Sequence, residues 1–253
     1  MNKIAAISLI SVFLMSGCAV HNDETSIGKF GLAYKSNIQR KLDNQYYTEA
    51  EASLARGRIS GAENIVKNDA ATARAITKKA KPQYRQIIRR LPEFEKADRF
   101  KMNLVNCAMI GAFILSMPQR PEVDRLTDYY AKAMMTKLMQ WFCRKSGKSK
   151  FTPKDIAAMK ATAALKAADR NPYSWNMEFY EYPDGSGYEG RFTKCGICVL
   201  MKELGLYDLT PALCRLDYTM SEAGGVTDFV RQYTLASGGP YCDCGYLCTG
   251  TCH

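Results

Sequence analysis

Cysteines crowd into the last third of this chain. Of the ten cysteines in 253 residues, seven lie beyond residue 170: Cys195, Cys198, Cys214, Cys242, Cys244, Cys248 and Cys252. Only two histidines are present, His21 near the start and His253 as the last residue. A site built on histidine as general base or as repeated metal ligand is therefore nearly excluded from the folded body. We expect the chemistry to use Cys, Asp, Glu, Arg, Lys, Tyr or Thr from the C-terminal third.

The first 17 residues read as an export signal. Lys3 precedes an apolar run over residues 4–15, which is too short for a stable transmembrane anchor. The run ends in Leu14-Met15-Ser16-Gly17-Cys18, which resembles the lipobox of bacterial lipoproteins and implies lipid attachment to Cys18. An ordinary signal peptide and an unprocessed apolar N-terminus are the alternatives. Residues 18–36 then form a lipidated tether, and the predicted location is the bacterial cell envelope, anchored to the outer membrane and facing the periplasm.

Charge is distributed unevenly along the chain. Residues 1–170 hold 30 Lys and Arg against 15 Asp and Glu, whereas residues 171–253 hold five against ten. The basic side chains are spread along predicted helices without an aromatic stacking platform, and an exported protein rarely meets DNA. We therefore predict a solvated helix surface, with attraction to anionic lipid headgroups as the alternative, and no nucleic-acid partner.

Residues 37–170 are predicted to form a helical region. Spacing and proline breaks place helices at 44–68, 69–81, 83–90, 94–117, 122–145 and 152–169. Thr152 followed by Pro153 is typical of a capped helix start. The apolar run 102–117 is short for a membrane span and contains Asn103 and Asn106, so it is predicted to be a buried core helix.

From residue 171 the apolar period changes from helical to alternating. Strands are expected at 175–182, 188–193, 226–235 and 241–246, with helices at 194–204, capped by Thr193, and at 210–223. Tight turns such as 183–187 join the strands, which favours an antiparallel sheet. The predicted fold class is α+β: a helical N-terminal layer followed by a β-β-α-α-β-β unit. Residues 171–253 form this Cys-rich region, in one compact domain with 37–170.

Two of the predicted helices carry reactive side chains. Cys195 is expected in the first helical turn, where unpaired backbone N–H groups lower the pKa of a thiol, and Cys198 lies three residues on along the same face. Cys214 and Asp217 are also three residues apart on one helical face. A thiol and a carboxylate held side by side on a helix suit proton transfer or ligation.

The third reactive segment precedes and enters the last strand. Gly238 and Gly239 permit a tight turn or a close approach of the backbone to a ligand. Cys242 and Asp243 follow directly.

Together these segments resemble the family of L-2-amino-thiazoline-4-carboxylic acid hydrolases. The resemblance covers roughly residues 175–246 and rests on the Cys195 helix, residues 202–205, residues 213–217, the strand with Phe229, Arg231, Thr234 and Leu235, and Gly238-Gly239 followed by Cys242-Asp243. It implies a hydrolase that adds water to a cyclic amidine-like carbon and opens a thiazoline ring to N-carbamoyl-cysteine. The export signal and the additional Cys244, Cys248 and Cys252 depart from the pattern expected of the family.

The chemistry implied by this resemblance can be assigned to residues in more than one way. The candidate catalytic residues are Cys195, Cys214, Asp217, Cys242 and Asp243, and the candidate substrate-binding residues are Arg231, Gly238 and Gly239. Asp217 protonates or orients the amidine, or activates water, whereas Cys195 or Cys214 attacks directly to form a covalent adduct. Arg231 is expected to bind a substrate carboxylate through a two-pronged contact.

A non-catalytic function is the alternative hypothesis. The chain would then be a membrane-anchored lipoprotein with a disulfide- or zinc-stabilised, Cys-rich binding module. Disulfides among Cys244, Cys248 and Cys252 would staple the C-terminus, and Cys107 and Cys143 are interpreted as ordinary buried residues. No cofactor is predicted; if zinc is bound, its ligands are Cys195, Cys198, Cys214 and Cys242. The expected partners are a small-molecule substrate and, through the lipid, a membrane.

Overall fold

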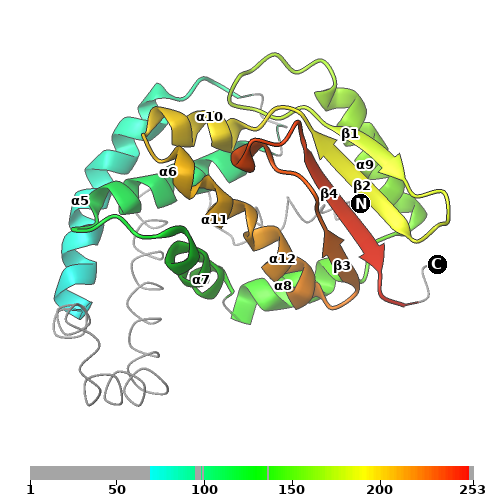
Figure 1. The fold of residues 1–253 in the computed structure, drawn as a ribbon, viewed down its shortest axis with the longest axis horizontal. Helices are drawn as coiled ribbons and strands as arrows, with labels where there is room; N and C mark the ends of the chain where they lie inside the picture. The colour runs from blue at the N-terminus through cyan, green and yellow to red at the C-terminus, as the bar shows by residue number, and fades with distance from the viewer. Residues whose placement is uncertain (1–68, 95–97, 99, 136, 251–253) are drawn as a thin grey trace, which may run out of the picture.

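A computed structural model describes residues 69–94, 98, 100–135 and 137–250. Helices pack on one side of a four-stranded antiparallel sheet (Figure 1), which confirms the predicted α+β class. The predicted export signal, the tether with Cys18, the predicted helix 44–68, and Cys252 lie outside the described residues.

Within the described residues, five helices precede the sheet. They are α5 (Asp69–Arg90), α6 (Lys101–Ser116), α7 (Val123–Met134), α8 (Lys137–Gly147) and α9 (Pro153–Lys166). Helix α9 starts as predicted, because the Thr152 hydroxyl accepts a hydrogen bond from the Asp155 amide at 3.2 Å and Pro153 occupies the first turn.

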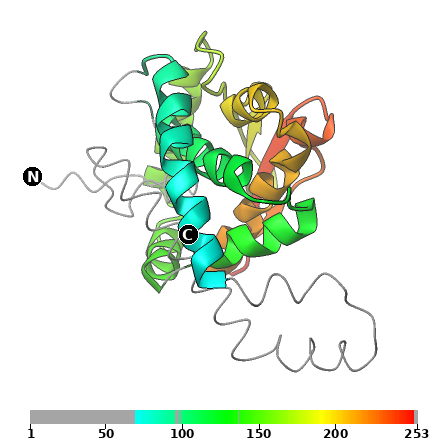
Figure 2. The same ribbon diagram turned by 90° about the vertical axis from the view of Figure 1, so that its left-hand side faces the viewer.

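Helix α6 forms the centre of the core. Leu104, Ala108, Ile110 and Phe113 are each at most 1% exposed, and neighbouring residues on both sides of the helix are buried as well. Helices α5 and α10 (Gly196–Glu203) pack against it, and Figure 2 shows α5 running along one flank of the molecule. The predicted core helix is confirmed, and none of the helices in the described residues has the length and apolarity to cross a bilayer.

The predicted break at Pro82 is wrong. Helix α5 continues through Pro82 to Arg90. A proline inside a helix costs about 3 kcal/mol because it removes one hydrogen bond and crowds the preceding turn. Here Ile76, Ala80 and Tyr84 recur every four residues and are at most 2% exposed. Burial of this stripe against α6 outweighs the local penalty.

Two segments that were predicted as single helices are each divided. Met135, with φ −79° and ψ 57°, ends α7, and α8 begins at Lys137; the Gln140 side chain donates to the Met135 carbonyl at 3.1 Å. The predicted helix 210–223 is divided at Arg215 into α11 (Thr210–Cys214) and α12 (Leu216–Gly224). The divided pairs pack on each other, since α7 contacts α11 and α8 contacts α12. Each half can therefore turn its own apolar face towards its partner.

The sheet has the order β1-β2-β4-β3, with all neighbours antiparallel. Its strands are β1 (Glu178–Glu181), β2 (Gly187–Phe192), β3 (Thr227–Val230) and β4 (Cys242–Cys248). Register pairs Phe192 with Cys242 and Gly190 with Cys244. Successive strand residues point to opposite faces. Cys242 and Cys244 are therefore on one face, and that face is buried.

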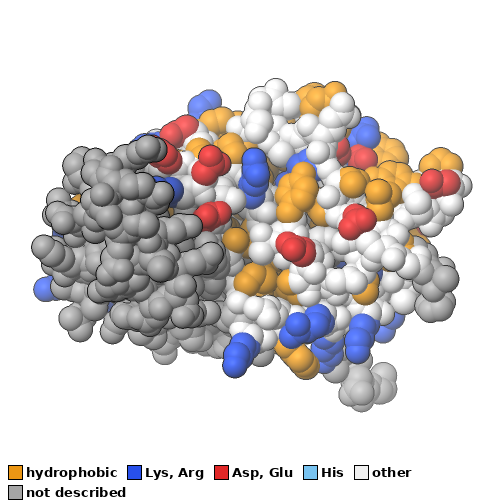
Figure 3. Space-filling model, turned by 60° about the horizontal axis from the view of Figure 1, so that its bottom comes forward, with side chains coloured by type: hydrophobic (Ala, Val, Ile, Leu, Met, Phe, Trp, Pro, Cys, Tyr) orange, Lys and Arg blue, Asp and Glu red, His pale blue; other side chains and the backbone are white. Residues whose placement is uncertain are grey.

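The described surface carries charges of both signs. On the face drawn in Figure 3, acidic side chains are scattered over the upper half, and Lys and Arg side chains gather along the lower edge. This distribution of charge does not test whether the basic helices are simply solvated, and it does not test whether the protein lacks a nucleic-acid partner. Both stay predictions.

Candidate functional site

A cavity of about 110 Å³ lies between the helices and the buried face of the sheet. Its polar and sulfur-bearing walls come from Asn103, Cys107, Tyr130, Cys195, Cys214, Asp217, Arg231, Cys242 and Cys244. Its apolar walls come from Trp175, Phe192, Ile197, Leu213, Leu216 and Met220. Five predicted site residues, Cys195, Cys214, Asp217, Arg231 and Cys242, are therefore brought together from four separate stretches of sequence.

Cys195 is placed at this cavity by the start of α10. It is the N-cap residue, with an extended backbone, and α10 begins at Gly196. A Cβ on Gly196 would lie 2.0 Å from the Tyr173 carbonyl oxygen, so only glycine allows this close approach. The predicted cap at Thr193 is wrong: the Asn176 side chain holds the amides of Thr193 and Lys194 at 3.0 and 2.7 Å, and the helix starts two residues later than expected.

The expected lowering of the Cys195 pKa is also wrong. The thiol hydrogen bond between Cys195 and Cys198 and the burial of Cys195 raise the pKa of Cys195 above its ordinary value. The backbone amides of Ile197 and Cys198 work in the opposite direction, as predicted for a helix N-terminus. They do not outweigh the other two effects.

Arg231 is the buried charge of the site. Its side chain is 6% exposed, and one Nη donates to the Asp217 carboxylate at 2.5 Å and to the Cys244 sulfur at 2.9 Å. The other Nη donates to the Cys214 carbonyl at 3.0 Å. Burial disfavours the cation, but Asp217 and Cys244 hold the pKa of Arg231 above its ordinary value. Three of the five guanidinium N–H groups are thus used within the protein and the Nε–H has no hydrogen-bond partner, so the expected two-pronged contact with a substrate carboxylate stays a prediction.

Arg231 also joins the two helices that meet at Arg215. By bonding Cys214 at the end of α11 and Asp217 at the start of α12, it fixes both sides of the junction. Asp217 remains 33% exposed, so its carboxylate stands where the site meets solvent. The helical spacing predicted that Cys214 and Asp217 share a face; they share the cavity across a helix break.

Near neutral pH the cavity thiols Cys195, Cys214, Cys242 and Cys244 carry their protons, because the pKa of each is raised above its ordinary value. Burial raises the pKa of Cys242 to about 11, against the Leu235 amide that donates to its sulfur at 3.2 Å. Burial likewise raises the pKa of Cys244 to about 12, opposed by Arg231. Burial raises the pKa of Cys214 as well, and the nearby Cys195 adds to this effect. A thiol acting as nucleophile here needs a base to remove its proton.

Three predicted site residues do not line the cavity. Asp243 lies between Cys242 and Cys244 on β4, so its side chain points to the opposite face of the sheet. There its carboxylate accepts hydrogen bonds from the backbone amides of Gln232 and Tyr233 at 2.7 and 2.6 Å. Gly238 has φ +80° and ends a short helical turn, and the Gly239 amide donates to the Thr234 carbonyl at 2.8 Å. The two glycines therefore shape the turn that leads into β4.

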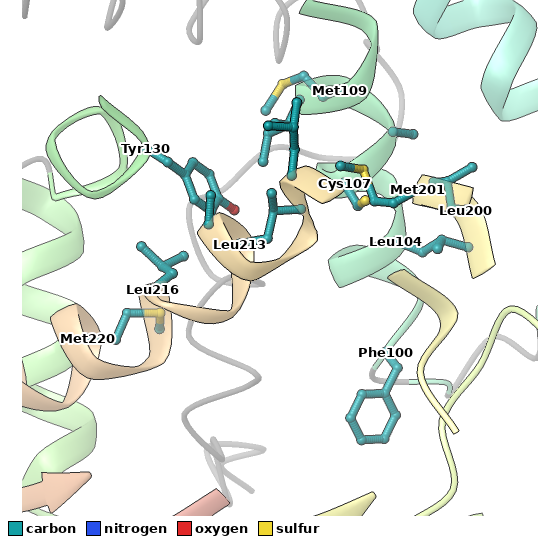
Figure 4. Close-up of a cluster of buried hydrophobic side chains, with 14 of the residues drawn as sticks. Phe100, Leu104, Cys107, Met109, Tyr130, Leu200, Met201, Leu213, Leu216 and Met220 are labelled. Carbon is teal, nitrogen blue, oxygen red and sulfur yellow. The ribbon is translucent and has the colours of Figure 1, made fainter. Parts of the chain in front are cut away.

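The sequence reasoning missed several cavity residues. Asn103 and Cys107 are one helical turn apart on α6, and Tyr130 comes from α7. Figure 4 shows the Tyr130 and Leu213 side chains facing each other from α7 and α11, with Cys107 further along the same cluster. Asn103 could have been recognised as a site residue because it is an amide within an apolar run. Cys244 could have been recognised because it lies two residues after Cys242 and therefore on the same face of the strand.

Seven cysteines of the described residues are free thiols: Cys107, Cys143, Cys195, Cys198, Cys214, Cys242 and Cys244. Cys248 is in a disulfide, so the predicted staple does not include Cys244. In the part of the chain that the structure describes, no group of three or more Cys, His, Asp and Glu side chains has the arrangement of a metal site. The zinc hypothesis stays untested.

Sequence comparisons match both halves of the chain. Residues 102–246 match the profile described as L-2-amino-thiazoline-4-carboxylic acid hydrolase, and residues 1–89 match the one described as Uncharacterised protein YegR. The chain is 96% identical over 70 residues to Uncharacterized protein YegR of Escherichia coli (strain K12), which covers 28% of this chain and 67% of that protein. No solved structure matches. Every cavity-lining residue falls within residues 102–246.

Proposed function

This chain belongs to the L-2-amino-thiazoline-4-carboxylic acid hydrolase family, and we propose that its cavity hydrolyses a cyclic amidine such as a 2-amino-thiazoline carboxylate. The reaction adds water to the ring carbon between nitrogen and sulfur. Its product resembles N-carbamoyl-cysteine and carries a new thiol.

The proposal rests on one observation: Asp217 and the cavity thiols line the same cavity. The carboxylate lies at the solvent-facing side of a small cavity, and Cys195, Cys214 and Cys242 form part of the same walls. A proton acceptor and potential nucleophiles therefore border one space. This is the arrangement that acid–base or covalent hydrolysis of a small ring needs.

The cavity suits a ligand of about one ring. Its volume of about 110 Å³ is of the same order as the roughly 150 Å³ of an engineered apolar cavity that holds benzene, and the cavity is open to solvent at the half-buried Asp217, which leaves room for ring substituents. Two buried polar atoms on its lining residues lack a hydrogen-bond partner, the Asn103 Oδ1 and the Arg231 Nε. An unpaired buried donor or acceptor costs about 1–3 kcal/mol. A ligand with an N–H group and a carboxylate can satisfy both after a small side-chain adjustment, which fits an amidine acid.

In the first route, Asp217 activates water. The carboxylate takes a proton as the water oxygen bonds to the ring carbon, and the ring nitrogen is protonated. The tetrahedral adduct then collapses to a urea-type carbonyl as the carbon–sulfur bond breaks. The departing sulfur receives a proton and becomes the product thiol, so one water is consumed and nothing is oxidised.

In the second route, a cavity thiol attacks the ring carbon. The Cys198 contact and burial keep Cys195 protonated, and burial keeps Cys214 protonated, so either thiol must first lose its proton to a base. The thiolate then bonds to the ring carbon, the ring carbon–sulfur bond breaks, and the departing ring sulfur takes up a proton, which leaves an isothiourea-type adduct on the cysteine. Water adds to the same carbon, the bond to the cysteine sulfur breaks, and the urea-type product and the protein thiol are released. Single Cys195→Ser and Cys214→Ser variants separate the routes, since the water route retains turnover in both.

Thiol release provides the test. The purified chain is incubated with 2-amino-thiazoline-4-carboxylate, new thiol is titrated, and the product mass is measured. We expect Asp217→Asn to lower the rate by about 10²–10⁴-fold, with Asp208→Asn, on the surface, as the matched control. Full turnover by Asp217→Asn would remove this carboxylate from the mechanism. No thiol release by the wild-type chain would favour the non-catalytic binding module.

We also propose that the protein is lipid-anchored through Cys18 in the bacterial envelope. The support is the Leu14–Cys18 pattern in the sequence. Labelling cells with an alkyne fatty acid should tag the wild-type chain, and Cys18→Ser should abolish the tag and release the protein from the membrane fraction. Equal labelling of both would refute the anchor.

A further inference from the structure

We propose that Asn103 selects ring substrates that carry an exocyclic amino group, because its Oδ1 accepts a hydrogen bond from that group. The inference rests on the proposed function, since it names what the same cavity recognises in its ligand. Asn103 lies on α6 and takes no part in either route of hydrolysis described above, so its role is to bind and select.

The Asn103 side chain holds an acceptor that has no donor. Its Oδ1 is shielded from solvent and makes no hydrogen bond, and the residue lines the cavity. Most buried polar side-chain atoms in folded proteins have a partner. The surroundings on α6 are apolar, with Leu104 0% and Cys107 1% exposed. An unpaired oxygen there costs stability that an apolar side chain would not cost, and an N–H group of a ligand in the cavity would supply the missing donor.

The position of Asn103 separates it from the groups assigned to the chemistry. It belongs to the first turn of α6, whereas Asp217 is in α12 and Arg231 follows β3. Arg231 has an unpaired Nε–H, which is a donor, and Asn103 has an unpaired acceptor. A ring acid whose carboxylate bonds to the donor and whose amino group bonds to the acceptor is held by two groups of opposite polarity. Its orientation in the cavity is then fixed.

The remaining side chains of the cavity are poorly suited to recognise an amino group. The Asp217 carboxylate already accepts a hydrogen bond from Arg231. The thiols of the walls are weak acceptors. Thr210 Oγ1 is also buried without a partner, but Thr210 does not line the cavity. The Asn103 oxygen is therefore the side-chain acceptor best placed to select the amine.

This contact gives the cavity a means of rejecting related rings. A ring with hydrogen in place of the amino group leaves Oδ1 buried and unpaired, as it is in the free protein. A site that is built to bond a polar group of its ligand discriminates strongly against an analogue that lacks the group. We therefore expect selection at this one substituent.

Binding of two aromatic ring acids tests the selection without turnover. The purified full chain is titrated by calorimetry with 2-aminothiazole-4-carboxylate and with thiazole-4-carboxylate, which lacks the amino group. We expect the wild type to bind the amino compound at least about tenfold more tightly. Asn103→Leu keeps the branching of the side chain but removes the acceptor, and should bind the two compounds within about twofold of each other. Asn103→Ala, which leaves more space, should lose the preference in the same way.

Thermal unfolding separates selection from a structural role. Because Oδ1 is unpaired in the free protein, Asn103→Leu should unfold at the same temperature as the wild type or higher. A structural hydrogen bond would predict the reverse, a lower melting temperature with an unchanged preference. The matched control is Asn106→Leu, on the same helix but outside the cavity lining, which should keep the tenfold preference.

The outcomes distinguish this inference from the proposed hydrolysis. Failure of the wild type to bind either compound, equal binding of both, or a preference that survives in the two Asn103 variants would overturn the inference, even if thiol is released from the thiazoline. Selective binding of the amino compound without thiol release would remove hydrolysis and leave the role of Asn103 standing.

Discussion

Replacing Asp217 by Asn tests the electrostatic core of the site. The substitution preserves the shape of the side chain but removes the charge opposite Arg231. The guanidinium is then left 94% buried with a neutral neighbour, while its bonds to the Cys214 carbonyl and the Cys244 sulfur persist. We expect a less stable protein as well as a slower enzyme.

The magnitude follows from the exposure of the two partners. Breaking a fully buried ion pair costs about 3–5 kcal/mol, and a hydrogen bond to a charged group contributes about 1.5–3 kcal/mol. Asp217 is 33% exposed, so water screens part of its attraction. We expect a loss of about 2 kcal/mol in the free energy of unfolding, which lowers the melting temperature by about 4–8 °C for a domain of this size.

Thermal unfolding followed by circular dichroism measures the effect. The matched control is Asp208→Asn, which breaks the ion pair with Arg120 at a surface where the side chains are 48% and 66% exposed. Such an exposed pair contributes about 0–1 kcal/mol. Equal melting temperatures for Asp217→Asn and wild type, or equal losses in both variants, would refute the assignment of Arg231 as a buried charge held by Asp217.

Further predictions concern proton binding, thiol reactivity and backbone packing. Burial lowers the pKa of Lys150, which donates to the Tyr188 hydroxyl at 2.6 Å, to about 8. The folded state therefore binds this proton less tightly than the unfolded state and gains stability as pH rises through 8. Between pH 7 and 9.5, urea titrations should show wild type gaining about 2 kcal/mol relative to Lys150→Met, and parallel curves would contradict this. Alkylation of Cys242 should accelerate about tenfold per pH unit up to pH 10, because its pKa is about 11; a plateau near pH 9, measured by mass spectrometry, would show an ordinary thiol. Gly196→Ala should abolish thiol release, because its Cβ would lie 2.0 Å from the Tyr173 oxygen. Gly225→Ala, with φ +73° and no neighbour within 4 Å, should lose about 1–2 kcal/mol of stability and keep turnover.

Local patterns predicted the fold class and many elements correctly. The apolar run 102–117 identified the core helix α6, Thr152-Pro153 marked the start of α9, and alternation with turn residues predicted an antiparallel sheet. These signals are carried by neighbouring residues, so they can be read without knowing the partners. The predictions were wrong for α5 at Pro82 and for the two divided helices. The course of these helices depends on packing against helices that are distant in the sequence.

The candidate site shows the same limit. Residue type and spacing singled out Cys195, Cys214, Asp217 and Cys242, the family resemblance added Arg231, and the structure brings all five to one cavity. The alternation of strand side chains already placed Asp243 opposite to Cys242, but which of those faces is buried is a tertiary property.

The sequence alone determined the chemical inventory of this protein: sulfur and carboxylate groups in the C-terminal third and scarce histidine. Only the tertiary structure decided the state of those groups. The contact with Cys198 and burial raise the Cys195 pKa where the helix start alone would lower it. One Nη of Arg231 donates to Asp217 and Cys244, and the other donates to the Cys214 carbonyl. The charge and proton affinity of a side chain depend on its burial and on the charges and hydrogen bonds within several ångströms of it. Folding decides which residues those neighbours are.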